Sequence, residues 1–211
     1  MRRNLVLYGL LAVVLGLAIG VWVEAAGGGA LPIDDVWAAW MLDIRVPVGE
    51  TIARFLNDVG GGWLGVVVVP LVTIAVLLGL RRPWAALYYA VAAVSSVALV
   101  QGLKWLFDRA RPEDMLVTSD AGSFPSGHVA NAATIAVTLT VIAARAWVAW
   151  LGGVYVLLMV VSRAYLTVHW LSDTVAGALI GAGVALAVAA AFLPRLTAER
   201  ERHRARAAVG S

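Results

Sequence analysis

Apolar residues occur along this chain in long runs separated by short polar connections. Runs of about 18 or more apolar residues are long enough to cross the hydrocarbon core of a bilayer as helices. Six such stretches are present: 5–23, 63–80, 84–107, 128–144, 147–165 and 171–193. The pattern predicts an all-α, polytopic membrane bundle of six transmembrane helices.

The connection over residues 24–62 is too polar to cross a membrane, yet it contains apolar residues at helical spacing. These residues are Ile33, Val36, Trp37, Trp40, Met41 and Ile44, and they lie opposite Asp34, Asp35 and Asp43. The spacing predicts an amphipathic helix in the membrane interface, ended by Pro47. A second short helix is expected over 51–59, before the glycines of 60–62 break the chain. For both helices, the alternative is that their apolar residues pack beneath a loop of the protein and do not contact the membrane interface.

Composition agrees with the membrane prediction. The chain is 62% hydrophobic and 14% charged, and its mean hydropathy is +0.87. Residues 1–194 are expected to form a single domain, followed by a basic, solvated tail over 195–211. Residues 1–30 have some features of a cleaved signal peptide, but the first apolar run is longer than such peptides use, which favours a retained helix. There is no cysteine, so thiol chemistry is excluded.

Positive charge gathers at one end of the predicted bundle. The residues are Arg2, Arg3, Arg81, Arg82, Arg145 and the arginines of 195–211. Acidic residues dominate the opposite connections. Because lysine and arginine remain on the cytoplasmic side, both termini are predicted to be cytoplasmic. The clustering at helix ends leaves no continuous basic face for nucleic acid.

The segment 161–173, VSRAYLTVHWLSD, places ionisable residues at the end of an apolar run. Such residues at membrane depth are costly and are candidates for function. His169 and Asp173 are four residues apart, which on a helix puts them on one face, where the carboxylate can orient the imidazole. Arg163 offers a planar fork for phosphate. The alternative is a salt bridge at a helix end beside an interfacial histidine.

The outer end of the third run reads KWLFDRARPED. Lys104 and Arg111 are about two helical turns apart, Arg109 adds a third cation, and Pro112 is expected to stop the helix. Cations gathered at one helix end repel one another unless an anion lies between them, and phosphate suits both lysine and arginine. Neutralisation by Asp108, Glu113 and Asp114 is the alternative.

The fourth run begins with Pro125, Ser126, Gly127 and His128. Backbone N–H groups at a helix N-terminus bind anions, and a histidine there can protonate a leaving oxygen. A Ser-Gly pair is also a common helix cap. By the topology above, all three stretches fall on the outer side of the membrane. Together they predict a phosphate pocket with two imidazoles.

The three stretches match, in order and spacing, the three-part signature of the type 2 phosphatidic acid phosphatase family. The matching segments are lysine, six residues and Arg-Pro at 104–112, PSGH at 125–128, and Ser-Arg, five residues, histidine, three residues and aspartate at 162–173. The chain resembles the integral membrane branch of this family, whose distant soluble relatives include vanadium-dependent haloperoxidases.

The resemblance implies a role for each signature residue. His169 would attack phosphorus to form a phosphohistidine, Asp173 would orient His169, and His128 would protonate the leaving alcohol. The phosphate oxygens would be held by Lys104, Arg111 and Arg163, with hydrogen bonds from Ser126 and Gly127. The family uses no metal ion, and no cofactor is expected.

The sequence therefore predicts a metal-independent lipid phosphatase or pyrophosphatase on the outer face of a cytoplasmic membrane. Its partners would be the bilayer and a lipid phosphate substrate of the polyprenyl pyrophosphate, phosphatidylglycerol phosphate or phosphatidic acid type, and nothing in the signature separates these substrates. Two alternatives remain, a lipid phosphotransferase using the same residues and a non-catalytic membrane transporter or scaffold.

Overall fold

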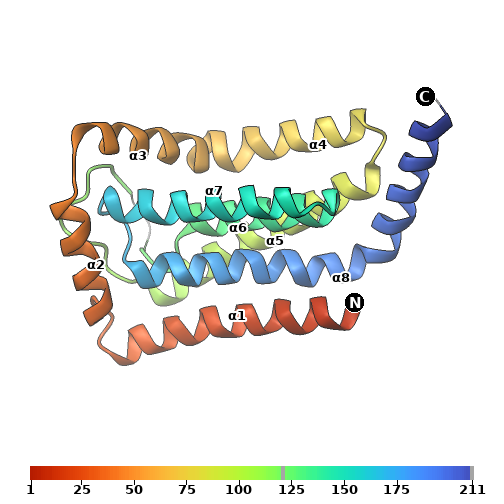
Figure 1. Ribbon diagram of the computed structural model, residues 1–211. Coiled ribbons are helices and arrows are strands. Elements are labelled where there is room, and N and C mark those ends of the chain that lie inside the picture. The colour runs from red at the N-terminus through yellow and green to blue at the C-terminus, as the bar shows by residue number, and fades with distance from the viewer. Residues whose placement is uncertain (120–121, 210–211) are drawn as a thin grey trace.

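The computed structural model describes residues 1–119 and 122–209, and the described chain consists of helices joined by loops, with no β-strand. The elements are α1 (Arg2–Ala25), α2 (Pro32–Asp43), α3 (Pro47–Gly60), the π-helical turn η1 (Leu64–Val68), α4 (Val69–Gly79), α5 (Pro83–Phe107), α6 (Gly127–Ala143), α7 (Ala146–Tyr165) and α8 (Leu171–Val209). The long helices run side by side, α2 lies across one end, and both termini lie at the other end (Figure 1). The all-α prediction is confirmed.

Four of the described helices are long and apolar enough to cross a membrane: α1, α5, α7 and the part of α8 up to His203. A fifth crossing is possible if α3 and α4 count as one span, bent by 46° at the break between them. The remaining apolar helix, α6, has 17 residues, at the lower end of the lengths that spanning helices have. The structure thus supports four or five spans by length and composition, where the sequence predicted six.

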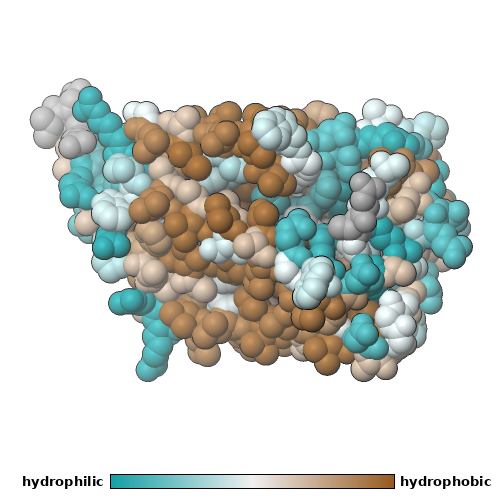
Figure 2. All heavy atoms as spheres, turned by 180° about the vertical axis from the view of Figure 1, so that it is seen from behind, coloured by the Kyte–Doolittle hydropathy of each residue, from teal (hydrophilic) through white to brown (hydrophobic). Residues whose placement is uncertain are grey.

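The surface agrees with a membrane location. Hydrophobic residues form a broad region across the middle of the molecule, and hydrophilic residues gather toward its two ends (Figure 2). Large apolar side chains are exposed on several of the long helices, among them Leu10 and Val14 on α1, Val94 on α5 and Leu157 on α7. Such exposure is expected where lipid is the solvent.

Helix α8 is the centre of the bundle, because it packs against α1, α5, α6 and α7. Its contact with α6 is unusually close. A Cβ atom added at Gly177 would lie 2.5 Å from the carbonyl oxygen of Ser126, and one added at Gly181 would lie even closer to the carbonyl oxygen of Ala130. Small residues let helix backbones approach in membrane proteins. The approach brings the N-terminus of α6 next to the first turn of α8.

The connection over residues 24–62, called the outer segment from here on, forms the two helices that the sequence predicted, with different bounds. The second helix begins at Pro47, not at residue 51, because proline suits the first turn of a helix. On α2, Ile33, Val36 and Trp40 are exposed, but Met41 is buried against α7. Asp34 was expected on the polar face, yet its exposure is 0%. The apolar residues of α2 thus divide between the surface and the core.

The basic tail is not solvated along its whole length. Helix α8 continues past Pro194 with a change of direction (Figure 1). Leu196 and Glu199 are buried, and the Glu199 carboxylate accepts hydrogen bonds from the backbone N–H groups of Trp84 (2.8 Å) and Ala85 (3.1 Å). These are unpaired donors of the first turn of α5, where a carboxylate is favoured. The first turns of the tail therefore belong to the folded core.

Candidate functional site

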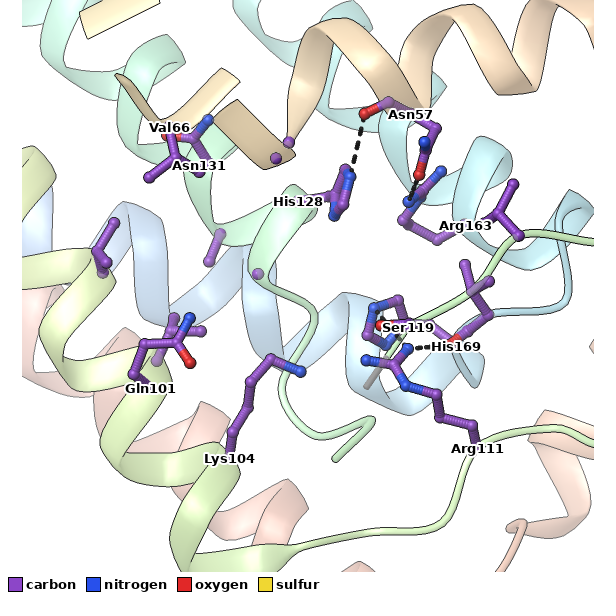
Figure 3. A pocket seen from close by; sticks show the side chains of 18 of the residues that line it. Asn57, Val66, Gln101, Lys104, Arg111, Ser119, His128, Asn131, Arg163 and His169 are labelled. Carbon is purple, nitrogen blue, oxygen red and sulfur yellow. Dashed lines mark hydrogen bonds between the residues drawn. The ribbon is translucent and has the colours of Figure 1, made fainter. Parts of the chain in front are cut away.

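A cavity of about 410 Å³ lies near the end of the bundle that α2 covers. It is lined by residues of α3, η1, α5, α6 and α7 and of the loops that precede α6 and α8. Six of the eight predicted site residues line it: Lys104, Arg111, Gly127, His128, Arg163 and His169. The side chains of His128 and His169 face each other across it (Figure 3). Segments far apart in the sequence thus converge as predicted.

The first motif leaves its helix earlier than expected. Helix α5 ends at Phe107, where Asp108 takes a left-handed conformation with φ 36° and donates its N–H to the Lys104 carbonyl. The prediction that Pro112 stops the helix was wrong by several residues. Lys104 therefore points into the cavity from the last turn of α5, and Arg111 reaches it from an extended loop.

Lys104 and Arg111 meet at one backbone carbonyl. Lys104 Nζ and Arg111 Nη2 both donate to the oxygen of Gly122, the second at 3.2 Å. Arg111 Nη1 donates to the carbonyl of Val168. Asp108, Glu113 and Asp114 are exposed, and within the described residues no ion pair joins them to Lys104. Neutralisation by these carboxylates is thus not what the structure shows for Lys104.

His169 and Asp173 pair, although His169 is not helical. Helix α8 begins at Leu171, so His169 lies in the preceding turn and Asp173 in the first helical turn. His169 Nδ1 lies 3.5 Å from Asp173 Oδ2, and Oδ2 also accepts the Trp170 N–H at 2.9 Å. On the other side of the ring, Nε2 lies 3.4 Å from Arg111 Nη1. The two ring nitrogens therefore face opposite partners, a carboxylate and the cavity.

The imidazole of His169 is kept neutral by its surroundings. Burial is the largest cause of its lowered pKa, which falls from 6.5 to about 4; the Asp173 carboxylate opposes this shift, whereas Arg111 and Lys104 reinforce it. With Nδ1 beside a carboxylate, the proton of the neutral ring belongs on Nδ1, and Nε2 keeps its lone pair. A neutral imidazole with an accessible Nε2 is the form that can attack an electrophile.

His128 and Arg163 are both held by Asn57 of α3. His128 Nε2 lies 3.2 Å from the Asn57 backbone oxygen, and Arg163 Nη1 donates to Asn57 Oδ1 at 2.9 Å. The Arg163 residue is 1% exposed, so its guanidinium faces only the protein and the cavity. Figure 3 shows Asn57 above both side chains. Neither the sequence pattern nor the signature indicated this residue, because it lies in the outer segment.

Ser126 and Asp173 do not line the cavity. Ser126 is fully buried at the N-terminus of α6, and its N–H donates to the Asp173 carbonyl at 3.0 Å. Its Oγ has no hydrogen-bond partner among the described residues. The Asp173 carboxylate lies behind His169. Gly127 lines the cavity as expected. Of the PSGH stretch, Gly127 and His128 are thus the residues in direct contact with the space available to a ligand.

Arg109 was expected as a third cation at the helix end, and the structure places it elsewhere. Its guanidinium pairs with Asp34 at 2.8 Å and with Asp173 at 2.6 Å, on the far side of Asp173 from the cavity. Arg111, two residues further on, instead donates to the carbonyls of Val168 and Gly122 at the cavity. Only the fold could show that these two arginines reach different partners.

Asn131 is another functional candidate that the motifs did not indicate. It lines the cavity, and its Nδ2 donates to the carbonyls of Gly60 (3.2 Å) and Gly65 (3.0 Å). These carbonyls flank the break between α3 and η1. A polar residue inside an apolar run was the available signal, since such residues face a protein interior or a cavity.

Within residues 1–119 and 122–209, no group of three or more His, Cys, Asp or Glu side chains is placed to hold a metal ion. Among the described residues that line the cavity are three cationic side chains and two imidazoles, but no carboxylate. Such groups suit an anion with several oxygens, such as phosphate.

Comparison with known proteins agrees with the geometry. A model of the PAP2 superfamily matches residues 85–196, more than half of the chain. No curated protein matches the sequence. A crystal structure described as the first transmembrane PAP2-type phosphatidylglycerolphosphate phosphatase, from Bacillus subtilis, has a similar fold, with a TM-score of 0.73 and 23% identity over 85% of this chain and 93% of that one.

The crystal structure of LpxE from Aquifex aeolicus is also similar. The TM-score is 0.63 and the identity 26%, over 72% of this chain and 91% of that one. The family match covers the segments that carry Lys104, His128 and His169. On these findings, the chain is a member of the PAP2 superfamily.

Proposed function

We propose that the protein is a lipid phosphatase or pyrophosphatase that works through a phosphohistidine on the outer face of a cytoplasmic membrane. The observation that carries the proposal is the pair of imidazoles, His128 and His169, on opposite sides of a cavity lined by three cationic side chains. Membership of a superfamily of phosphatases supports it.

His169 is the proposed nucleophile. Its Nε2 attacks phosphorus, the bond from phosphorus to the leaving oxygen breaks, and the ring becomes a cationic phosphohistidine. Asp173, 3.5 Å from Nδ1, orients the ring and stabilises this charge. Lys104, Arg111 and Arg163 neutralise the oxygens of the transferring phosphoryl group, which is where catalysis of phosphoryl transfer is concentrated.

His128 is the proposed acid and base. It gives a proton to the leaving oxygen in the first step, and in the second it takes a proton from the water that attacks the phosphohistidine. The second step breaks the bond between phosphorus and Nε2 and releases phosphate. The contact of His128 with the Asn57 carbonyl, 3.2 Å, positions the ring on the cavity wall.

The substrate is proposed to be a lipid phosphate. The Bacillus subtilis neighbour is a phosphatidylglycerolphosphate phosphatase by its description, so the corresponding lipid is one candidate, beside phosphatidic acid and a polyprenyl pyrophosphate. A phosphotransferase, in which an alcohol replaces water in the second step, would use the same residues. A transporter or scaffold would need neither the neutral His169 nor its pairing with Asp173.

Six crossings are proposed for the membrane topology, with α3–α4 as one bent span and the 17 residues of α6 as another. Helix α6 packs against α5, α7 and α8, so neighbouring helices surround it. The arginines at the end that holds both termini support a cytoplasmic location for that end, with the cavity on the opposite side.

Phosphate release from a panel of lipids tests the proposal directly. The purified protein would be given phosphatidylglycerol phosphate, phosphatidic acid and undecaprenyl pyrophosphate in mixed micelles, without and with a large excess of glycerol. We expect phosphate release from at least one lipid and none with His169→Ala. Phosphoglycerol in place of phosphate would identify a transferase, and no turnover of any lipid by a folded protein would contradict the proposal.

A further inference from the structure

Behind His169, away from the cavity, three charged side chains form a closed buried network. Arg109 Nη1 donates to Asp173 Oδ1 at 2.6 Å, and Arg109 Nη2 donates to Asp34 Oδ2 at 2.8 Å. The side-chain exposures are 1% for Arg109 and 0% for both carboxylates. Neither Arg109 nor Asp34 lines the cavity, so neither can touch the substrate.

Asp34 belongs to the outer segment, outside residues 85–196 that match the family model. Besides the bond from Arg109, its carboxylate accepts three hydrogen bonds: from the N–H of Leu31 at 3.0 Å, the N–H of Ser172 at 2.8 Å and the Ser172 hydroxyl at 2.7 Å. Ser172 lies next to Asp173 in the first turn of α8. The N-terminus of α2 is thereby attached to the turn that carries the His169 partner.

The charges of the network have a consequence for His169. A buried carboxylate without a partner is very unfavourable, and Arg109 supplies that partner for Asp173. However, an isolated Arg–Asp pair is neutral and has little attraction left for a cationic ring. Asp34 adds a second carboxylate, so the group of Asp34, Arg109 and Asp173 has a formal net charge of −1. That negative charge is located directly behind the ring that becomes cationic on phosphorylation.

We propose that Asp34 and Arg109 are positioning residues of the active site: Arg109 fixes the Asp173 carboxylate, and Asp34 keeps the group negatively charged beside His169. The inference rests on the proposed function. A merely structural role, in which Asp34 caps α2 and joins it to α8, is the competing explanation. The two differ in what they predict for the protonation of His169.

The acid side of the pH profile of kcat/KM separates them, because it reports protonation of the nucleophile in the free enzyme. The charged or titratable groups that act on the ring are Asp173, Arg111, Lys104 and, from across the cavity, His128. None of these changes in the variants below. Ionisation of the substrate is also common to all of them.

Asp34→Asn makes the group neutral and so disfavours the imidazolium. The acid limb of the profile, where kcat/KM decreases because His169 becomes protonated, should move to lower pH by about one unit. The value of kcat should fall by about tenfold. In Asp34→Asn/Arg109→Gln the group again carries −1, from Asp173 alone. The limb should return to its wild-type position, even though a second hydrogen-bonding residue has been lost. Asp35→Asn is the matched control, since Asp35 is the exposed neighbour on the same helix, and it should change neither quantity.

Each outcome is decisive. A limb that stays in place in Asp34→Asn, or that fails to return in the double variant, would overturn the inference. The limb position does not depend on the amount of active protein, so partial misfolding does not hide it. If Asp34→Asn is inactive, activity in the double variant supports the proposed charge balance, whereas inactivity of both indicates a structural role. A wild-type protein inactive on every lipid of the panel would instead be a failure of the proposed function.

Discussion

Gly61 lies directly against His128. A Cβ atom built on Gly61 would be 2.0 Å from His128 Nε2 and 2.3 Å from Cε1, far inside van der Waals contact. Gly61 has an extended backbone, with φ −144°, so another residue could adopt its conformation. It is therefore the space beside the imidazole, not the backbone, that requires glycine at the break between α3 and η1.

Gly61→Ala should consequently reduce kcat with little change in the amount of folded protein. The added methyl group forces the His128 ring away from its position, and a displacement of about 1 Å can cost about 100-fold in rate. Gly153→Ala is the control, because nothing lies within 4 Å of a Cβ at that position. Measured phosphate release within a factor of two of wild type would show that His128 is not fixed as described.

His128→Ala should affect substrates according to their leaving groups. An alkyl phosphate needs its leaving oxygen protonated, whereas an aryl phosphate leaves as a more stable anion. We expect the loss of kcat/KM to be about 100-fold or more for the alkyl substrate and clearly smaller for the aryl one. Equal losses on the two substrates would remove His128 from the role of the acid.

Stability should depend on pH through His169. Burial lowers the pKa of His169 to about 4 in the folded protein, while the ordinary value of about 6.5 applies in the unfolded chain. Between these pH values the unfolded state binds more protons than the folded state. The contribution of His169 to the free energy of unfolding is therefore fully present above about pH 6.5 and is lost as the pH falls toward about 4. Tm measured by tryptophan fluorescence across this range should fall more for the wild type than for His169→Gln. Parallel curves would contradict the assignment.

Orthovanadate should inhibit the enzyme, and chelators should leave its rate unchanged. Vanadate adopts five-coordinate geometry and so resembles the phosphoryl group in transfer, which an enzyme complementary to its transition state binds tightly. Lys104, Arg111 and Arg163 would supply the positive charge that metal ions supply in two-metal phosphatases. Activity after exhaustive dialysis against a chelator, with and without added magnesium, is the measurement. Recovery only on addition of magnesium would contradict the metal-free mechanism.

The proposed orientation can be tested with single cysteines, since the natural chain has none. Gly29→Cys lies in the outer segment, where a Cβ has open space, and it should react with an impermeant thiol reagent in intact cells. Arg202→Cys, in the exposed part of the C-terminal helix, should react only after the cells are opened. Labelling of position 202 alone in intact cells would place the cavity in the cytoplasm.

The apolar runs were sufficient to predict most of the helices. Helices α5, α6 and α7 begin and end within two residues of the predicted 84–107, 128–144 and 147–165, because in lipid a long apolar run satisfies its backbone groups by forming a helix. The three motifs also identified six of the residues that line the cavity. Both results depend on information that is local in the chain.

Contacts between distant segments were outside the reach of such patterns. The sequence shows Asp34 as a polar residue of an amphipathic helix and Arg109 as one of several cations, yet the two meet in the core beside Asp173. Asn57 and Glu199 have likewise no local signal for the partners they hold. Burial of a charged side chain is costly unless the packing of helices brings it a partner, and that partner can lie anywhere in the chain. The sequence by itself therefore determined the helices and the chemistry of the motifs, and only the tertiary structure decided which charged residues face the cavity and which support it from behind.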